Sequence, residues 1–200
     1  MAFVMKDEVF ADLISRCKEI CEKGEPLPAD KILTCLMNEK GIVMHCPYHH
    51  FIMPAALLTA VALEQKRSCE ELIQLLEQAE ERAKTVPGGF CGNCGSCGAA
   101  VGAGIFVSVL TGASPMTREN WQWANEVTGR CLIAIARYPG PRCCKRTSFL
   151  AVREAVPYIN EKCGLHLTVS EEIICEYHEK NAQCLEEECP FYHVEKERML

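Results

Sequence analysis

The sequence predicts an all-α fold: a single compact helical domain of about seven helices, with a cysteine-rich loop and a small C-terminal segment of metal-binding type. Apolar residues recur at three- and four-residue steps over most of the chain. Glycines and prolines separate these stretches. Only residues 165–169 alternate like a strand, and one strand cannot form a sheet. We expect the helical domain to span residues 1–169 and the C-terminal segment residues 170–200.

The first three helices are predicted from apolar stripes and from the residues that end them. Apolar residues from Val4 to Cys21 mark one face of an amphipathic helix that Gly24 closes. Asp30 is expected to cap a shorter helix that ends at Gly41. The third helix is expected to begin near Pro54, because proline is tolerated in a first turn, and to end near Lys66.

The next helices follow from caps and from small residues. Ser68 and Glu71 have the spacing of a capping box, which predicts a helix that starts there. After the cysteine-rich loop, residues 98–110 are small or β-branched, and they predict a helix that permits close approach of another backbone or a cofactor.

The last helices are predicted from capping residues and from the proline and glycine residues that interrupt a helix. Thr117 is expected to cap a helix that ends before the Tyr-Pro-Gly-Pro run at 138–141. Residues 147–162 predict a further helix, kinked or restarted at Pro157 and ended by Gly164. Ser170 is expected to cap a final helical segment.

Composition and charge exclude several classes of protein. The 200 residues are 48% hydrophobic and 24% charged, which is typical of a globular chain and excludes a disordered or fibrous one. The net charge of −6 gives no indication of a nucleic-acid or anionic-membrane partner. The 33 residues between Lys84 and Arg118 carry no formal charge, but glycine and proline fill their first half, so we expect a buried helix and not a membrane span.

Cysteine is unusually abundant, with 15 residues, an odd number that cannot all pair in intramolecular disulfides. Lys6, Asp7 and Glu8 lie where a secretory signal requires an apolar run. We therefore expect a cytoplasmic protein with reduced thiols.

The first candidate site is the loop Phe-Cys-Gly-Asn-Cys-Gly-Ser-Cys-Gly at residues 90–98. Cys91, Cys94 and Cys97 have the C-x2-C-x2-C spacing of the first three ligands of a bacterial iron–sulfur run, but Val101 stands where the fourth cysteine would fall. An iron–sulfur cluster, of 4Fe-4S type, would take its last ligand from elsewhere or keep an open iron. The alternatives are a zinc knuckle and a tight glycine turn with inert thiols.

The second candidate is the run Arg142, Cys143, Cys144, Lys145, Arg146. Adjacent cysteines point in different directions, so one thiol can join the cluster while its neighbour serves another purpose. We expect the basic side chains to lower the pKa of these thiols or to bind an anionic group of a substrate. The alternative is a solvated basic loop around a core cysteine.

The third candidate is His-Cys-Pro-Tyr-His-His at residues 45–50. His49 and His50 are expected at the start of a helix, with ring nitrogens free to act as metal ligands or general acid–base groups. The alternative is that they are hydrogen-bonded core residues.

The fourth candidate lies near the C-terminus. Cys175, His178, Cys184 and Cys189 offer four soft or borderline ligands within fifteen residues, and Pro190 stiffens the last turn. They predict a structural zinc site, with His193 as a spare ligand. The alternative is a disordered acidic tail that carries stray cysteines.

Three segments carry a resemblance to a known family: GFCGNCGSCGAAVGAGIF, GPRCCKR and CPFY. They resemble a cysteine-rich domain family of unknown function from anaerobic bacteria and archaea, which occurs alone or behind a SAM-dependent methyltransferase domain. The resemblance implies an anaerobic setting and no particular mechanism. The CGSCGAA stretch is also similar, over a shorter length, to redox proteins named for a C-GCA-G-C-C pattern.

These observations lead to one functional hypothesis with two alternatives. The first is an iron–sulfur redox protein or cluster-assisted enzyme acting on a small sulfur- or methyl-containing substrate, with Cys143 or Cys144 as the distant ligand. The second is a zinc-binding structural or metallochaperone module that partners a methyltransferase. The third is a thiol or persulfide relay through Cys143 and Cys144. Whether the protein is an enzyme or serves a redox partner protein stays open.

Overall fold

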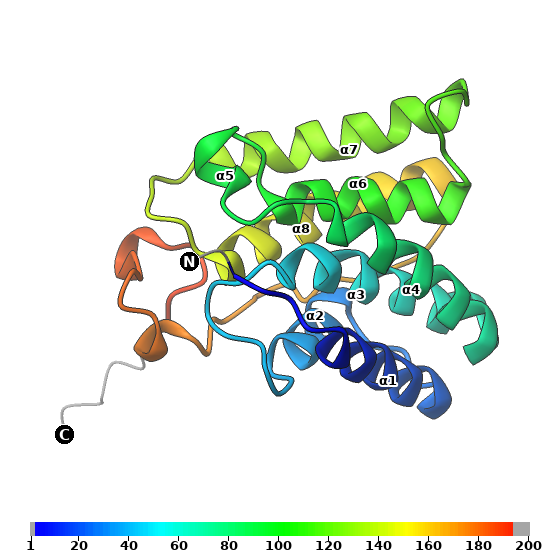
Figure 1. Ribbon diagram of the computed structural model, residues 1–200, viewed down its shortest axis with the longest axis horizontal. Helices are drawn as coiled ribbons and strands as arrows, with labels where there is room; N and C mark the ends of the chain where they lie inside the picture. The colour runs from blue at the N-terminus through cyan, green and yellow to red at the C-terminus, as the bar shows by residue number, and fades with distance from the viewer. Residues whose placement is uncertain (1–2, 194–200) are drawn as a thin grey trace.

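The computed structural model describes residues 3–193 of the chain (Figure 1). Most of these residues form α-helices. The predicted all-α class is confirmed, and no β-strand occurs among these residues. The described residues form eight α-helices, one of which is a short helix within the cysteine-rich loop. The helices are α1 (Asp7–Lys23), α2 (Ala29–Met37), α3 (His49–Gln65), α4 (Cys69–Lys84), α5 (Phe90–Asn93), α6 (Gly98–Thr111), α7 (Glu119–Ala136) and α8 (Cys144–Cys163).

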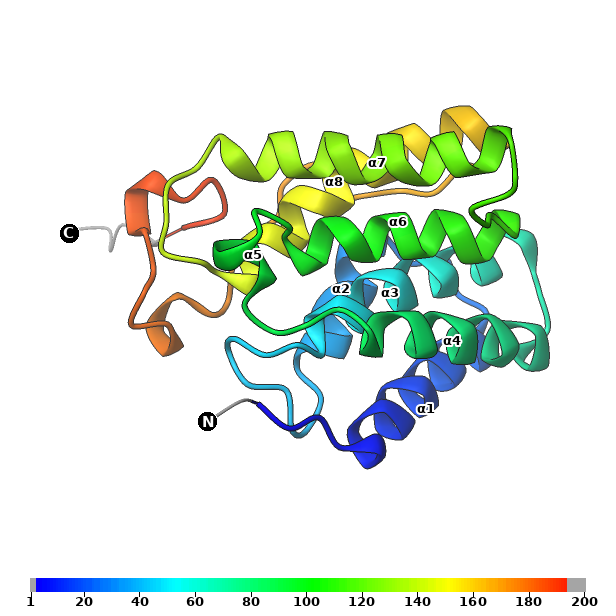
Figure 2. The same cartoon turned by 45° about the horizontal axis from the view of Figure 1, so that its top comes forward.

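The apolar helix α3 lies at the centre of the bundle. It packs against α1, α2, α4, α6 and α8, and α6 in turn packs against α7 and α8. Figures 1 and 2 both show α7 along one side of the molecule and α1 along the other. Nearly all of α3 is buried, as expected of a helix that is apolar on every face. The predicted start near Pro54 is wrong: α3 begins at His49, and Pro54 lies inside it.

Glycines of α6 allow its neighbours to approach closely. A Cβ at Gly102 would lie 2.9 Å from the carbonyl oxygen of His50 and 3.0 Å from Pro54 Cδ, both in α3. A Cβ at Gly104 would collide with Thr128 of α7. The small residues therefore serve helix packing along this length of α6.

Some predicted caps are confirmed. The capping box of Ser68 and Glu71 is complete, because the Ser68 hydroxyl accepts from Glu71 N and the Glu71 carboxylate accepts from Ser68 N. Gly24 and Gly164 end α1 and α8 with φ of 65° and 64°, a conformation that favours glycine.

Three other predicted caps are wrong, and two of the three side chains, those of Asp30 and Thr117, bond to other partners. Asp30 lies within the first turn of α2, and its Oδ1 accepts a hydrogen bond from Ser170 N at 2.8 Å. Thr117 bonds back to Ser114, and α7 starts at Glu119. No helix starts at Ser170.

The predicted break at Pro157 is also absent, because α8 runs from Cys144 to Cys163 without interruption. Its start precedes the predicted start at Thr147 by one turn, and Cys143 is its N-cap. The two adjacent cysteines therefore lie at a helix N-terminus, not in a free loop.

The contrast between Ser68 and Ser170 yields a stability prediction. Ser68→Ala is expected to lower the free energy of unfolding by about 1 kcal/mol, because it removes an N-cap hydrogen bond. Ser170→Ala is expected to change it by less than about 0.5 kcal/mol, because only the backbone of Ser170 is bonded to Asp30. Urea unfolding followed by circular dichroism measures both. Equal losses in the two variants would contradict the capping assignment.

The segment after α8 packs against the helices without forming the predicted strand at 165–169. Asn160 bonds to both backbone groups of Leu167, and Thr168 O accepts from Ala29 N. Two short 3-10 turns follow, at His178–Lys180 and Glu186–Glu188. Residues 194–200 of the predicted C-terminal segment lie outside the described residues.

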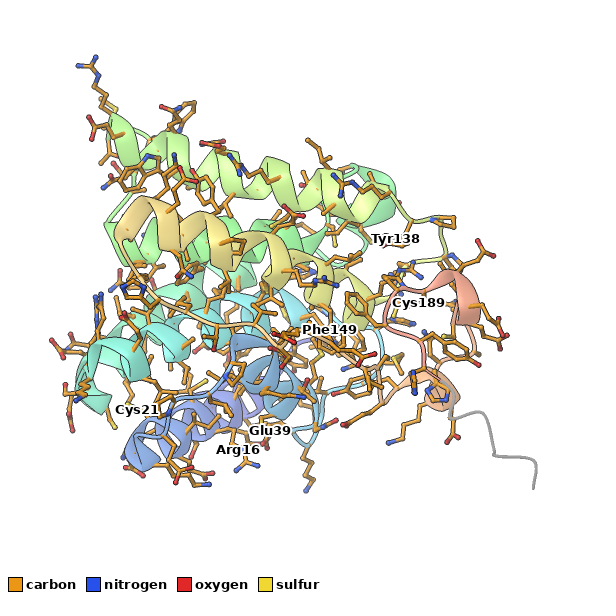
Figure 3. The ribbon with its side chains drawn as sticks, turned by 180° about the vertical axis from the view of Figure 1, so that it is seen from behind. Arg16, Cys21, Glu39, Tyr138, Phe149 and Cys189 are labelled. Carbon is orange, nitrogen blue, oxygen red and sulfur yellow. The ribbon has the colours of Figure 1, made fainter. Side chains whose placement is uncertain are left out.

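Two buried aromatic rings attach the C-terminal segment to the helices. Phe191 is buried and meets the ring of Phe149 in α8 edge to face at 5.3 Å. Tyr177 is buried as well. Figure 3 shows Cys189, close to Phe191 in the chain, at the same end of the bundle as Tyr138.

Within residues 3–193, no helix combines the length and apolar character needed to cross a membrane.

Candidate functional site

A cavity of about 970 Å³ is lined in part by residues of α5. Figure 2 shows α5 at one end of the bundle. The walls of the cavity come from the start of α3, the loop around α5, the end of α7 with the loop after it, and the first turn of α8. This volume is in the range of about 300–1,000 Å³ typical of small-molecule and cofactor sites. The lining residues with reactive or charged side chains are His49, His50, Cys91, Cys97, Arg142, Cys143, Cys144 and Arg146.

The three thiols of the C-x2-C-x2-C loop do not converge. Cys91 lies within α5, is half-buried and lines the cavity. Cys94 follows α5, is exposed and does not line the cavity. Cys97 is buried at the N-cap of α6 and lines the cavity. Gly95 has φ of 65°, which reverses the chain between the last two thiols.

Cys143 faces the C-terminal segment as well as the cavity. Its sulfur accepts a hydrogen bond from Arg146 N at 3.5 Å and lies 3.6 Å from the donor Nδ2 of Asn181. It lines both the large cavity and a small pocket beneath the C-terminal segment.

Cys144 has a different environment. Burial raises the pKa of its thiol to about 12, and the neighbouring thiols of Cys46 and Cys97 add to the rise. The expected lowering of thiol pKa by the basic run is therefore wrong for Cys144, because desolvation of a thiolate outweighs the attraction of nearby cations. Cys144 is a protonated thiol at neutral pH unless a metal displaces its proton.

His49 is fully engaged in a buried network. Its Nδ1 donates to the carbonyl oxygen of Cys46 at 3.0 Å, and its Nε2 accepts from the Lys145 ammonium at 3.0 Å. The same ammonium contacts Met37 O at 3.4 Å and lies over the Tyr177 ring. Burial, with the charge of Lys145, lowers the pKa of His49 to about 3. Both ring nitrogens of His49 are thus occupied, although the ring borders the cavity.

His50 keeps one nitrogen available. Its Nδ1 donates to Val86 O at 3.1 Å, so the lone pair of the neutral ring is on Nε2. The ring packs directly on Gly98, where any Cβ would overlap it. Burial lowers the pKa of His50, which keeps the ring neutral. Of the two predicted histidines, His50 is the one with a free acceptor beside the cavity.

The three predicted anion-binding residues occupy three different environments. Arg142 is exposed and lines the cavity. Arg146 is buried, and its guanidinium donates to the carbonyl oxygens of Pro139 and Pro141 at 3.0 and 2.9 Å, which holds the loop after α7. Lys145 does not line the cavity, and burial lowers its pKa to about 8.

The predicted C-terminal ligands gather around the second, much smaller pocket of about 10 Å³. Cys175, His178, Cys184 and Cys189 all line it, and Cys143 at the start of α8 lines it as well. Within residues 3–193, no group of three or more His, Cys, Asp or Glu side chains is arranged to hold a metal ion. Neither set of thiols is therefore a ready-made metal site in this structure.

The model of a family of unknown function, DUF5714, matches residues 17–192. The chain belongs to this family. The match includes the cysteine loop, the adjacent cysteines of α8 and all three C-terminal cysteines, so both pockets lie within the family domain. No curated protein and no solved structure matches the chain.

The sequence did not indicate the polar link between the family domain's two pockets. His45 accepts from Cys144 N at 3.5 Å through Nδ1 and donates to Asn181 Oδ1 at 3.2 Å through Nε2. Asn181 in turn approaches Cys143. His45 belongs to a recognisable histidine cluster, but Asn181 carries no local signal, since its partners are 136 and 38 residues away.

Proposed function

We propose that the protein binds an iron–sulfur cluster in the large cavity and uses it in electron transfer or in chemistry on a small molecule. Cys91, Cys94, Cys97 and Cys144 are the proposed ligands. The observation that carries the proposal is that two cysteine motifs distant in sequence border one cavity. Of the two candidates for the distant ligand, Cys143 and Cys144, we propose Cys144, because the sulfur of Cys143 is engaged with the C-terminal segment.

The four proposed ligands are cysteines, the residue type that binds iron–sulfur clusters, and one of them, Cys94, has to move to reach the cavity. Cys91, Cys97 and Cys144 already border the cavity. Cys94 is exposed on a loop in which Gly92 and Gly95 have no neighbouring atom within 4 Å of a would-be Cβ, so close packing does not hold these two positions of the loop. Thiolates hold iron–sulfur clusters, which supply electron transfer or a Lewis-acidic iron.

Other residues of the chain have roles that follow from their positions. The N-terminus of α6 directs backbone N–H groups toward the loop, where they stabilise negative charge on sulfur. His50 Nε2 is the proposed proton acceptor, and exposed Arg142 the proposed partner of an anionic substrate group. Leu132 and Ile135 of α7 form an apolar part of the cavity wall.

The structure offers less support for a thiol or persulfide relay through Cys143 and Cys144. A relay needs a thiolate nucleophile, and burial raises the pKa of Cys144 to about 12. We also propose that the protein is cytoplasmic, because thiols stay reduced in the cytoplasm. The proposed substrate is a small sulfur- or methyl-containing molecule, and the proposed partner protein is a methyltransferase.

Anaerobic purification and reconstitution with iron and sulfide test the proposal. The wild-type protein is expected to gain broad visible absorption, iron and acid-labile sulfide. Cys94→Ser is expected to lose most of all three, and it is suited to the test because Cys94 is exposed and contributes little to folding. Cys144→Ala is expected to lose them as well.

Cys163→Ser provides the matched control. Cys163 is a free, half-buried cysteine at the end of α8 and borders neither pocket. This variant is expected to retain the chromophore. A wild-type protein that stays colourless and free of sulfide, or a Cys144→Ala variant that binds as much iron as the wild type, would refute the assignment.

A further inference from the structure

We propose that Cys143, Cys175, Cys184 and Cys189 form a four-thiolate zinc site that fastens the C-terminal segment to the N-terminus of α8. The site is separate from the proposed cluster and does not depend on it. It differs from the site expected from sequence, in which His178 was the fourth ligand. Cys143, from the start of the last long helix, takes that place.

The dimensions of the small pocket suit a single ion. Four cysteines line a hollow of about 10 Å³, which has room for about one water-sized sphere and no organic ligand. Zinc bonds thiolate sulfur at about 2.3 Å in a tetrahedral arrangement. Binding therefore draws the four sulfurs inward from their present positions around the hollow.

Backbone N–H groups donate hydrogen bonds to the sulfurs of two of the four cysteines. The pairs are Arg146 N with Cys143 at 3.5 Å and Glu186 N with Cys184 at 3.4 Å. Such donors stabilise a thiolate over a thiol, and they remain usable when the sulfur binds a metal.

Buried cations offset the charge of the site. Four thiolates and one zinc ion leave two negative charges uncompensated. Arg146 lines the pocket and is buried, and Lys145 is buried above the ring of Tyr177, another lining residue. These two cations explain how a dianionic centre can be buried. The pocket thus gives a role to Lys145, which does not line the large cavity.

The fourth ligand is assigned to Cys143 on the basis of orientation. The Cys143 sulfur is buried and points at Asn181 of the C-terminal segment. The His178 ring borders the pocket, but it packs edge to face on Tyr192 at 5.2 Å, and its Nδ1 lies 3.4 Å from Cys175 O. A rigid helix N-cap positions its thiol better than a short 3-10 turn positions this ring.

The metal would also shape the large cavity, because Cys143 lines both spaces. Between α8 and residue 193, the helical structure is limited to two short 3-10 turns, and irregular segments of this kind are commonly held by a structural metal. Zinc would therefore hold the first turn of α8, which presents Cys144 to the cavity.

Two measurements test the inference. The first is metal analysis of the full-length protein, and the second is titration of its metal-free form with zinc and with cobalt(II). The wild type is expected to bind about one zinc per chain tightly and to give the intense visible spectrum of tetrahedral cobalt thiolate. Cys143→Ser and Cys184→Ser are each expected to lose this spectrum and at least tenfold in zinc affinity. Cys144→Ala and His178→Ala are expected to retain both.

The two adjacent cysteines separate this inference from the proposed function. Loss of zinc with retention of iron and sulfide is expected in Cys143→Ser, and the reverse in Cys144→Ala. Cys184 is half-buried in the C-terminal segment, so Cys184→Ser reports on zinc even if Cys143→Ser does not fold. Zinc loss in His178→Ala but not in Cys143→Ser, or tight zinc in Cys184→Ser, would overturn the inference.

Discussion

Replacing Gly102 by alanine is expected to lower the free energy of unfolding by about 1–3 kcal/mol. The new Cβ would lie 2.9 Å from His50 O and from Met53 Cβ and 3.0 Å from Pro54 Cδ, all in the central helix α3. None of these atoms is the end of a flexible side chain, so the two helices have to move apart. Because His50 borders the large cavity, the same change is expected to disturb the cavity wall.

Gly129→Ala is the matched control for this prediction. Gly129 lies inside α7, and no heavy atom is within 4 Å of a would-be Cβ there. Alanine at this position is expected to raise the free energy of unfolding by about 0.5–1 kcal/mol, because glycine is a poor residue for a helix interior. Urea unfolding of both variants measures the difference. Stabilisation by Gly102→Ala would show that α3 and α6 do not pack as described.

Lys145→Ala is expected to lower the free energy of unfolding by about 3 kcal/mol or more, because it opens a cavity and leaves buried acceptors without a donor. The lost donor serves His49 Nε2 and Met37 O, and the ammonium also contacts the Tyr177 ring. Relief from burying a charge offsets part of this loss. The predicted effect is large because Lys145 joins α2, α3, α8 and the C-terminal segment.

The control for Lys145 is Lys31→Ala in α2, an exposed position. This variant is expected to change the free energy of unfolding by less than about 0.5 kcal/mol. Thermal and urea unfolding of zinc-supplemented samples compare the two. A Lys145→Ala protein as stable as Lys31→Ala would mean that the buried network contributes nothing to the fold.

Local signals in the sequence predicted the fold class and most helices. Apolar periodicity predicts α1, α4 and α7, and glycine in a left-handed conformation ends α1 and α8 as expected. The capping box at Ser68 is confirmed because all its atoms lie within one turn. The predicted cap at Asp30 is wrong because its carboxylate accepts a hydrogen bond from Ser170 N, which lies 140 residues away in the chain.

The candidate site was predictable only as separate motifs. The spacing of Cys91, Cys94 and Cys97 and the pair at 143 and 144 are visible in the sequence, and the structure brings both to one cavity. The basic residues around Cys144 in the sequence do not indicate that its thiol is buried, so the predicted direction of its pKa shift was wrong. Desolvation depends on the atoms packed around a group, and those come from distant segments.

The sequence by itself determined the helices and the positions of the cysteines among them, because apolar periodicity and glycine spacing act within one or two turns. The tertiary structure decided which thiols share a space. It turns Cys143 toward the C-terminal segment and Cys144 toward Cys46 and Cys97, and it occupies both nitrogens of His49 while leaving His50 Nε2 available. These outcomes depend on how whole helices pack, so no local pattern encodes them.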